Sequence, residues 1–295
     1  MKKILLLVCL LSGPFYSLLQ AQTPEVKGLN TINQQTAEAH IGFLADDLLE
    51  GREAGFKGGR LAGAYIVSCL KAMGVSPLQD SYYQPFEAYN RERQKRGRYQ
   101  VHPDSIAVLK QQTHQCLQLN NVLAKIEGKN PDEYVIVGAH YDHLGMDPAL
   151  AGDQIYNGAD DNASGVSAVL QIARAFLATG VKPERTVIFA FWDGEEKGLL
   201  GSSYFVQSFP YIDRMKGYLN FDMIGRNNNE ANPEHVVYFY TEAHPVFGDW
   251  LKRDISKYGL KLKPNYRPWD KPVGGSDNAS FAKLNIPVIW YHTDG

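Results

Sequence analysis

The chain of 295 residues lacks most of the compositional features that would indicate its protein class at once. It has 3 cysteines; Cys9 lies in the apolar N-terminal stretch, and Cys69 and Cys116 fit a disulfide or two buried thiols equally well. Lysine and arginine total 30 against 32 aspartate and glutamate, so no basic excess points to nucleic acid as a partner. The one basic run, residues 91–98, lacks interleaved aromatic side chains and fits a solvated loop.

Long hydrophobic runs are also missing, and the apolar stretch near the N-terminus is too short to be a permanent membrane span. That terminus has a basic start (MKK), an apolar segment (ILLLVCLL) and a small residue, Ala21, at a plausible cleavage point. A lipid anchor at Cys9 is disfavoured because Val8 before it is not small. We expect residues 1–21 to be a signal peptide and residues 22–295 to be exported, either to the periplasm or as a secreted protein.

Hydrophobic residues make up 44% of the chain, which is ordinary for a globular domain with one sizeable core. Three short apolar runs, at residues 134–137, 186–191 and 218–221, are rich in β-branched or aromatic residues and predict buried strands. Between the first two, residues 164–180 have apolar side chains at helical spacing. This order predicts a single α/β domain with a mixed, largely parallel central β-sheet flanked by helices on both faces.

A further amphipathic helix is predicted over residues 58–74, where Gly74 is placed to end it. Its apolar face is expected to contain four side chains spaced four residues apart: Leu61, Tyr65, Cys69 and Met73. From about residue 80 to residue 113 the sequence is polar and aperiodic. We expect a long irregular connection there.

Histidine and carboxylate side chains follow each of the three predicted strands. His140 and Asp142 follow the first strand, Glu195 and Glu196 follow the second, and Asp222 follows the third. Ligands of open α/β sheets gather outside the carboxyl ends of the strands, so these residues are expected to converge. Each one alone also fits a buried histidine, a turn residue or a helix cap. Together they predict a cation site.

The segment NGADDNASG, residues 157–165, precedes the predicted helix and has two adjacent carboxylates, Asp160 and Asp161. Adjacent like charges need bulk solvent or a cation, although the segment alone fits an exposed turn and helix cap. Imidazole and carboxylate are common zinc ligands. Because the donors exceed one tetrahedral set, we expect two zinc ions bridged by Asp160, with Asp161 supporting the loop.

Asp142 and the adjacent residues Glu195 and Glu196 are expected to have different roles. Asp142 lies two residues beyond His140, where its carboxylate could accept the second ring N–H and orient the ligand. Glu195 and Glu196 are adjacent, so their side chains diverge, and one can bind metal while the other stays free. A free carboxylate at such a site fits a general base for hydrolysis.

Six segments of the chain resemble the secreted dizinc aminopeptidases, the family that includes bacterial leucyl aminopeptidases and the aminopeptidase Y type. In order they are LADDLLEGREAGFKGG, GAHYDHLG, NGADDNASG, FWDGEEKGLLGS, LNFDMIG and GGSDNASFAKLNIPV, spanning about residues 40–290. The resemblance implies an exported zinc metallopeptidase that removes residues from the free N-terminus of peptides.

Carried over residue by residue, the resemblance implies four metal ligands: His140, Asp160, Glu196 and Asp222. His140 and Asp222 would bind one zinc ion and Glu196 the other, with Asp160 bridging both. Glu195 would be the general base and Asp142 would support His140. Asp161 would follow Asp160 through a cis peptide bond.

One part of the family pattern is not matched. The family's fifth ligand is a histidine several residues beyond the strand that corresponds to residues 286–290, whereas this chain stops at Gly295. His292 lies too close to that strand, so we expect the fifth ligand beyond Gly295 and a catalytic domain truncated at its C-terminus. The segment from residue 80 to residue 113 is too short for the inserted domain of larger relatives.

Two other functions are compatible with this fold. A glutaminyl cyclase, which is an acyltransferase with one zinc ion, is disfavoured because such cyclases typically have one aspartate followed by serine where this chain has Asp160 and Asp161. A metal-free binding ectodomain is disfavoured because the metal-ligating residue types are retained.

Overall fold

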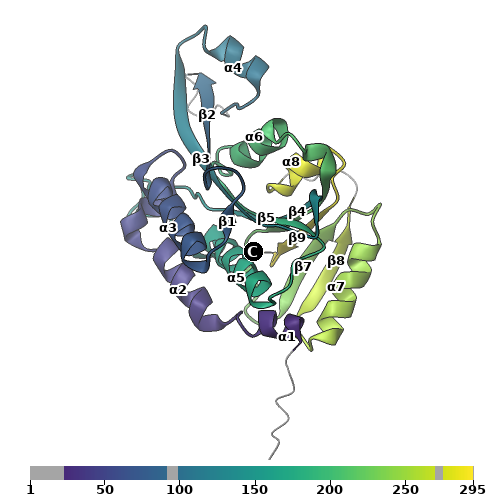
Figure 1. Ribbon diagram of the computed structural model, residues 1–295. Helices are drawn as coiled ribbons and strands as arrows, with labels where there is room; N and C mark the ends of the chain where they lie inside the picture. Colours follow the sequence, from purple (N-terminus) through teal and green to yellow (C-terminus); the bar gives the residue numbers. More distant parts are fainter. Residues whose placement is uncertain (1–22, 92–98, 270–274, 295) are drawn as a thin grey trace, which may run out of the picture.

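The computed structural model describes residues 23–91, 99–269 and 275–294. The predicted signal peptide therefore lies outside the described residues, as do residues 92–98 of the basic run. The described strands form one sheet in the order β1-β3-β5-β4-β6-β9-β7-β8, with β2 paired to β3 off this path (Figure 1). The strands are β1 (Ser76–Pro77), β2 (Tyr83–Arg91), β3 (His114–Ile126), β4 (Asn130–His140), β5 (Arg185–Trp192), β6 (Met215–Phe221), β7 (His235–Tyr240), β8 (Lys263–Pro268) and β9 (Val288–His292).

The three predicted strands correspond to β4, β5 and β6, which form the centre of the sheet. Strand β4 pairs in parallel with β5 and β6, and β6 pairs in parallel with β9. Antiparallel pairing occurs between β3 and β5 and between β7 and β9. The predicted α/β fold with a mixed, largely parallel sheet is confirmed.

Helices cover both faces of the sheet because alternate residues of the central strands point to opposite sides. Val137 and Ala139 belong to a core that includes side chains of α2 (Gln34–Leu44), α3 (Lys57–Met73) and α5 (Gly165–Ala178). Ile136 belongs to the opposite core, with Phe205 of α6 (Leu200–Ser208) and Phe281 of α8 (Asn278–Ala282). Helix α1 (Pro24–Leu29) packs on α5, and α7 (Val246–Lys257) packs near β7 and β8 (Figure 1).

Helix α3 matches the predicted helix and ends at Gly74, whose left-handed backbone (φ 77°) forms the C-cap. The predicted apolar face is shifted, however. Ala62, Ile66 and Leu70 are fully buried, whereas Leu61 is 42% exposed. Three glycines of this helix are also buried. Two of them, Gly58 and Gly59, lie so close to main-chain oxygens of the preceding segment that a Cβ atom would clash there, so the buried face of the helix includes its smallest residues.

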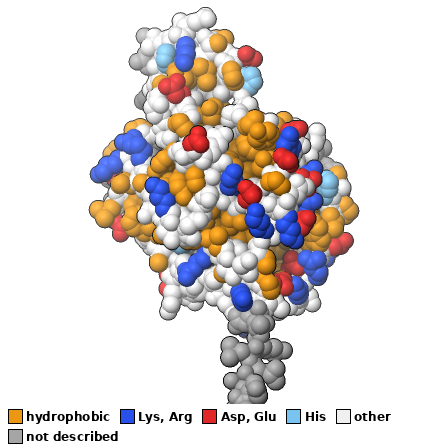
Figure 2. Space-filling model, viewed as in Figure 1, with side chains coloured by type: hydrophobic (Ala, Val, Ile, Leu, Met, Phe, Trp, Pro, Cys, Tyr) orange, Lys and Arg blue, Asp and Glu red, His pale blue; other side chains and the backbone are white. Residues whose placement is uncertain are grey.

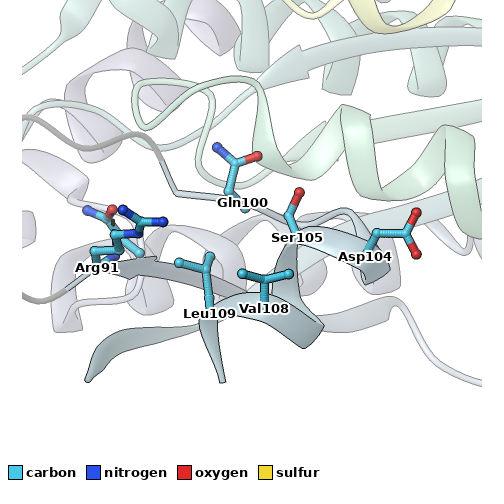
Figure 3. A pocket seen from close by; sticks show the side chains of 7 residues that line it. Arg91, Gln100, Asp104, Ser105, Val108 and Leu109 are labelled. Carbon is cyan, nitrogen blue, oxygen red and sulfur yellow. Dashed lines mark hydrogen bonds between the residues drawn. The ribbon is translucent and has the colours of Figure 1, made fainter. Parts of the chain in front are cut away.

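The expectation of an irregular connection between residues 80 and 113 is wrong. Strand β2 and helix α4 (Pro103–Leu109) lie there, and with part of β3 they form an arm that projects from the sheet (Figure 1). Much of β2 faces solvent, so its composition is polar and hides the strand. A pocket of about 440 Å³ lies between β2 and α4, lined partly by Arg91, Asp104 and Leu109 (Figure 3).

The exposure of the two cysteines and the distribution of surface charge bear on two expectations from the composition. Cys69 is half-buried and Cys116 is exposed, and both are free thiols, so the chain does not have the two buried thiols that were one expectation. Acidic and basic side chains are interspersed over the face shown in Figure 2, in keeping with the balanced composition. Among the helices described here, none has the length and apolar character needed to cross a bilayer.

Candidate metal centre

Parallel pairing brings two of the predicted ligands to one edge of the sheet. His140 is the last residue of β4, and Asp222 directly follows β6. The two strands run side by side, with Gly138 opposite Asn220. Because both strands end at the same edge, the imidazole of His140 and the carboxylate of Asp222 meet, with 3.5 Å between Nε2 and Oδ1.

Asp161 completes this first donor group, which we define as His140, Asp161 and Asp222. Its Oδ1 lies 3.2 Å from His140 Nε2. The group is largely closed to solvent at its base, since the side chains of His140 and Asp222 are only 2% and 7% exposed.

A second donor group consists of His143, Asp161 and Glu196. His143 Nδ1 lies 2.7 Å from Glu196 Oε1 and 3.8 Å from Asp161 Oδ2. Asp161 thus turns one carboxylate oxygen toward each group. In both groups the donor atoms lie within 4.8 Å of one another, close enough for each set to hold one metal ion.

The expectation that Asp160 lies between the two groups is wrong, because its side chain is engaged elsewhere. Asp160 Oδ1 accepts hydrogen bonds from the amide of Gly225 (2.7 Å) and from Ser164 Oγ (3.3 Å). The cis peptide bond joins Asp161 to Asn162, rather than Asp160 to Asp161. Adjacent side chains point in different directions, and the loop geometry directs the second carboxylate, not the first, into the centre.

Asp142 has a different neighbourhood from the one expected. Its carboxylate accepts hydrogen bonds from the amides of Glu195 (3.0 Å) and Glu196 (3.3 Å). The carboxylate Oδ1 is 3.7 Å from His140 Nδ1, whereas the main-chain oxygen of Asp142 is 3.2 Å away. The fully buried carboxylate of Asp142 therefore holds the turn that carries both glutamates, and its carbonyl group is the nearer partner of the histidine.

Electrostatics in the metal-free centre reflect its crowded carboxylates. Burial raises the pKa of Glu195 to about 9, and the carboxylates of Asp277, Asp222 and Asp142 add to this effect. Burial acts to lower the pKa of His140, but the nearby carboxylates outweigh it and raise this pKa well above the ordinary value. Without a metal ion, protons therefore neutralise part of the negative charge.

Asp161 is held in its ionised form. Burial acts to raise its pKa, but the hydrogen bond to His140 and the nearby side chains of His140, His143 and Arg52 lower it below the ordinary value. Its carboxylate is thus ready to bind a cation.

The structure adds one histidine to the predicted donors and leaves His292 outside them. His143 belongs to a donor group, although it was not among the predicted ligands; the signal was its place in GAHYDHLG, three residues after His140. His292 belongs to neither group among the described residues. Its Nδ1 lies 2.9 Å from the main-chain oxygen of Asp222, so it contacts the end of β6 instead.

The residues present fit zinc. Imidazole and carboxylate donors are its common protein ligands, and a carboxylate shared between two groups is the arrangement found in two-metal hydrolytic sites. An α/β sheet with such a centre at the carboxyl ends of its strands defines a metallohydrolase class. A sequence profile of peptidase family M28 matches residues 121–295, more than half of the chain, so the chain belongs to peptidase family M28.

Curated relatives match the chain over part of their length. Leupeptin-inactivating enzyme 1 of Streptomyces exfoliatus is 33% identical over 170 residues, covering 57% of this chain and 34% of that protein. Leucine aminopeptidase 2 of Trichophyton equinum is 38% identical over 179 residues, covering 57% of this chain and 32% of that protein. The matches thus span about a third of the length of these relatives.

Solved structures share the fold. LapA of Legionella pneumophila has a TM-score of 0.63 at 21% identity, covering 92% of this chain and 64% of that chain. A zinc aminopeptidase from Bacillus subtilis has a TM-score of 0.64 at 16% identity, covering 88% and 84%. A glutaminyl cyclase from Porphyromonas gingivalis has a TM-score of 0.57 at 17% identity, covering 88% and 83%.

Proposed function

We propose that this chain forms the catalytic domain of an exported, zinc-dependent aminopeptidase with two metal ions. The observation that carries the proposal is the position of Asp161, which directs one carboxylate oxygen to each of two donor groups. His140 and Asp222 would hold one zinc ion with Asp161, and His143 and Glu196 would hold the other with the same aspartate. The named aminopeptidases among its relatives support a peptide with a free N-terminus as substrate.

Zinc, when bound, supplies a Lewis acid that activates water and polarises the peptide carbonyl group. Glu195 belongs to neither donor group and is buried among site residues, so its carboxylate is free to accept the proton of the attacking water. The same carboxyl group would then donate this proton to the departing amine. Cations in the centre would lower the pKa of Glu195 from its raised value and make it a base at neutral pH.

Asp142 acts in this proposal by positioning, not by proton transfer. Its two carboxylate oxygens accept the amides of Glu195 and Glu196, so it fixes the base relative to a metal ligand. A buried carboxylate between two amides holds that turn more firmly than a neutral acceptor would.

A substrate panel tests the proposal. The purified chain is incubated with zinc and either aminoacyl-arylamides or peptides with an N-terminal glutamine. Release of the arylamine supports the aminopeptidase, whereas cyclisation of glutamine without arylamide hydrolysis would assign the chain to the glutaminyl cyclases. Absence of both reactions, with no zinc bound, would favour a metal-free binding domain and contradict the proposal.

Export is tested on the protein made in a bacterial host with its N-terminus intact. We expect the mature protein outside the cytoplasm to begin at residue 22, after removal of the predicted signal peptide. Mass spectrometry of the exported protein measures this, and an unprocessed cytoplasmic chain would contradict it.

A further inference from the structure

Arg52 is a fully buried arginine whose guanidinium group hydrogen-bonds to main-chain oxygens of several segments. Its Nε donates to Tyr141 O at 3.0 Å, between His140 and Asp142 in the chain. Its Nη1 donates to Leu44 O and Asn157 O at 2.5 and 2.6 Å, and its Nη2 donates to Gly158 O and Asp161 O at 2.9 and 3.4 Å. One side chain thus joins the end of β4 to the loop that carries Asp161.

The main chain around Arg52 holds the other side of the centre. Arg52 O accepts a hydrogen bond from His143 N at 3.1 Å, and Gly51 O accepts one from Gly145 N at 3.1 Å. Glu53 also forms an isolated parallel bridge with His143. The segment that follows β4 and carries His143 is therefore fixed by the same short turn that presents the Arg52 side chain.

The backbone of this turn is unusual. Glu50, Gly51 and Arg52 have φ values of 50°, 68° and 50°, all in the left-handed region, which non-glycine residues rarely adopt. A Cβ atom at Gly51 would lie 2.2 Å from Gly145 O, so only glycine fits there. Disfavoured backbone of this kind persists where surrounding contacts over-determine it, and it marks sites where orientation matters.

A buried cation beside a cation site is electrostatically unfavourable for metal binding, so charge alone does not explain this arginine. Burial lowers the pKa of Arg52 to about 10, and the carboxylates of Asp142, Asp161 and Glu196 offset part of that effect, so it stays protonated at neutral pH. What arginine offers and lysine does not is a planar set of five N–H donors, and here that set reaches five carbonyl groups on three segments of the chain.

We propose that Arg52 is a positioning residue that places Asp161 between the two donor groups before metal binds. This inference rests on the proposed function, because that function supplies the zinc ions. The position of the Asp161 loop, however, can be measured in the protein without metal. Arg52 acts through the carbonyl groups of residues 157, 158 and 161 and through the amide of His143, and it touches neither substrate nor the reacting atoms.

The test compares R52K, which keeps the charge but loses the planar donor set, with the parent chain and with R185K. Arg185 is a half-exposed arginine paired with Glu133 on the surface, so R185K controls for the substitution itself. Hydrogen exchange is measured on the metal-free proteins in chelator. We expect amides of residues 157–163 and 141–145 to exchange at least about tenfold faster in R52K alone, with the remaining domain unchanged.

Zinc titration gives the second measurement. We expect R52K to bind zinc about 10–100-fold more weakly than the parent, the range typical of lost support to a metal ligand. Added guanidinium ion should restore zinc binding to R52A, because it can refill the vacated donor position. The proposal would be overturned if guanidinium ion does not restore zinc binding to R52A and if R52K has the hydrogen exchange and zinc affinity of the parent chain.

Two other outcomes are informative. Faster exchange over the whole domain in R52K would assign Arg52 to folding in general and would also overturn the proposal. Failure of the parent chain to bind zinc would contradict the proposed function, but the exchange comparison in chelator would still decide whether Arg52 places the Asp161 loop.

Discussion

The two donor groups share Asp161 but are built by different parts of the fold. The first group takes His140 and Asp222 from the ends of paired parallel strands, so the hydrogen bonds of the sheet fix their separation. The second group takes His143 and Glu196 from segments beyond the strands, which are held by loop contacts to Arg52 and Asp142. The Glu196 side chain is also more exposed, at 19%.

This difference predicts different zinc affinities for the two donor groups. A group fixed by the sheet is pre-organised and loses little freedom when it binds a metal ion, so it is expected to bind more tightly. A group fixed by loops depends on neighbouring contacts and can adjust to a substrate. We therefore expect the first group to fill before the second as zinc is added.

The largest effect is expected for the residue that both groups share. D161A should lose both zinc ions and all measurable hydrolysis, since each group would keep only two donors. D160A is the matched control, because Asp160 contacts Gly225 and Ser164 and not the donor groups. Elemental analysis of both variants measures the zinc content, and two ions retained in D161A would refute the sharing of Asp161.

The next largest effect is expected for the two adjacent glutamates, one proposed as the base and the other as a zinc ligand. E195Q should keep its zinc but lose about 10²–10⁴-fold in turnover, because an amide of similar shape cannot accept a proton. E196Q is the adjacent comparison and should lose zinc from the second group. Turnover and zinc content measured together distinguish them; near-normal turnover in E195Q would remove Glu195 from its proposed role.

The histidines compare the two groups directly. H140A should weaken zinc binding by more than about 100-fold, the upper range for losing a residue that only supports a ligand. The reason is that His140 is itself a donor and lies at the buried end of a strand. H143A should weaken binding of the second ion alone, by at least about 100-fold because a direct donor is lost, but by less than H140A weakens binding of the first ion. Competition with a chromophoric chelator resolves the two affinities. Equal losses in both variants would contradict the distinction between a sheet-fixed and a loop-fixed group.

The smallest effect concerns pH and the metal-free protein. Burial raises the pKa of Glu195 to about 9 and those of Asp193 and Asp277 to about 7, whereas unfolded carboxyl groups titrate near 4. Between about pH 4 and pH 9 the folded state therefore binds more protons than the unfolded state, so its stability should fall as pH rises.

Zinc should reverse this slope, because its ligands must be deprotonated and its affinity falls as pH falls. Urea unfolding at pH 5.5 and pH 8.5, with chelator or with zinc, measures both cases. The same slope with and without zinc would show that these buried carboxyl groups are not coupled to the metal centre.

Much of this architecture could be predicted because strong local patterns determine it. The strand ends after β4, β5 and β6 carry histidine and carboxylates, and parallel pairing brings them together as expected. The choice between Asp160 and Asp161 could not be predicted, since it depends on the turn that begins at Gly158 (φ 63°) and on the amide N–H that Gly225 donates to the Asp160 carboxylate.

The arm and His143 were missed for related reasons. Strand β2 is half exposed, so its apolar pattern is too weak to mark a strand. The backbone of His143 is held by the turn at Glu50–Arg52, almost a hundred residues earlier in the chain. Contacts between distant segments of this kind leave no periodic trace in the sequence.

The central claim is that Asp161 serves both donor groups, and a zinc-edge anomalous difference map from crystals of the zinc-loaded chain tests it most directly. We predict two peaks, each about 2.0–2.2 Å from a different oxygen of Asp161, one near His140 and Asp222 and the other near His143 and Glu196. Peaks bound by Asp160, or a single peak with Asp161 on one ion only, would contradict the account.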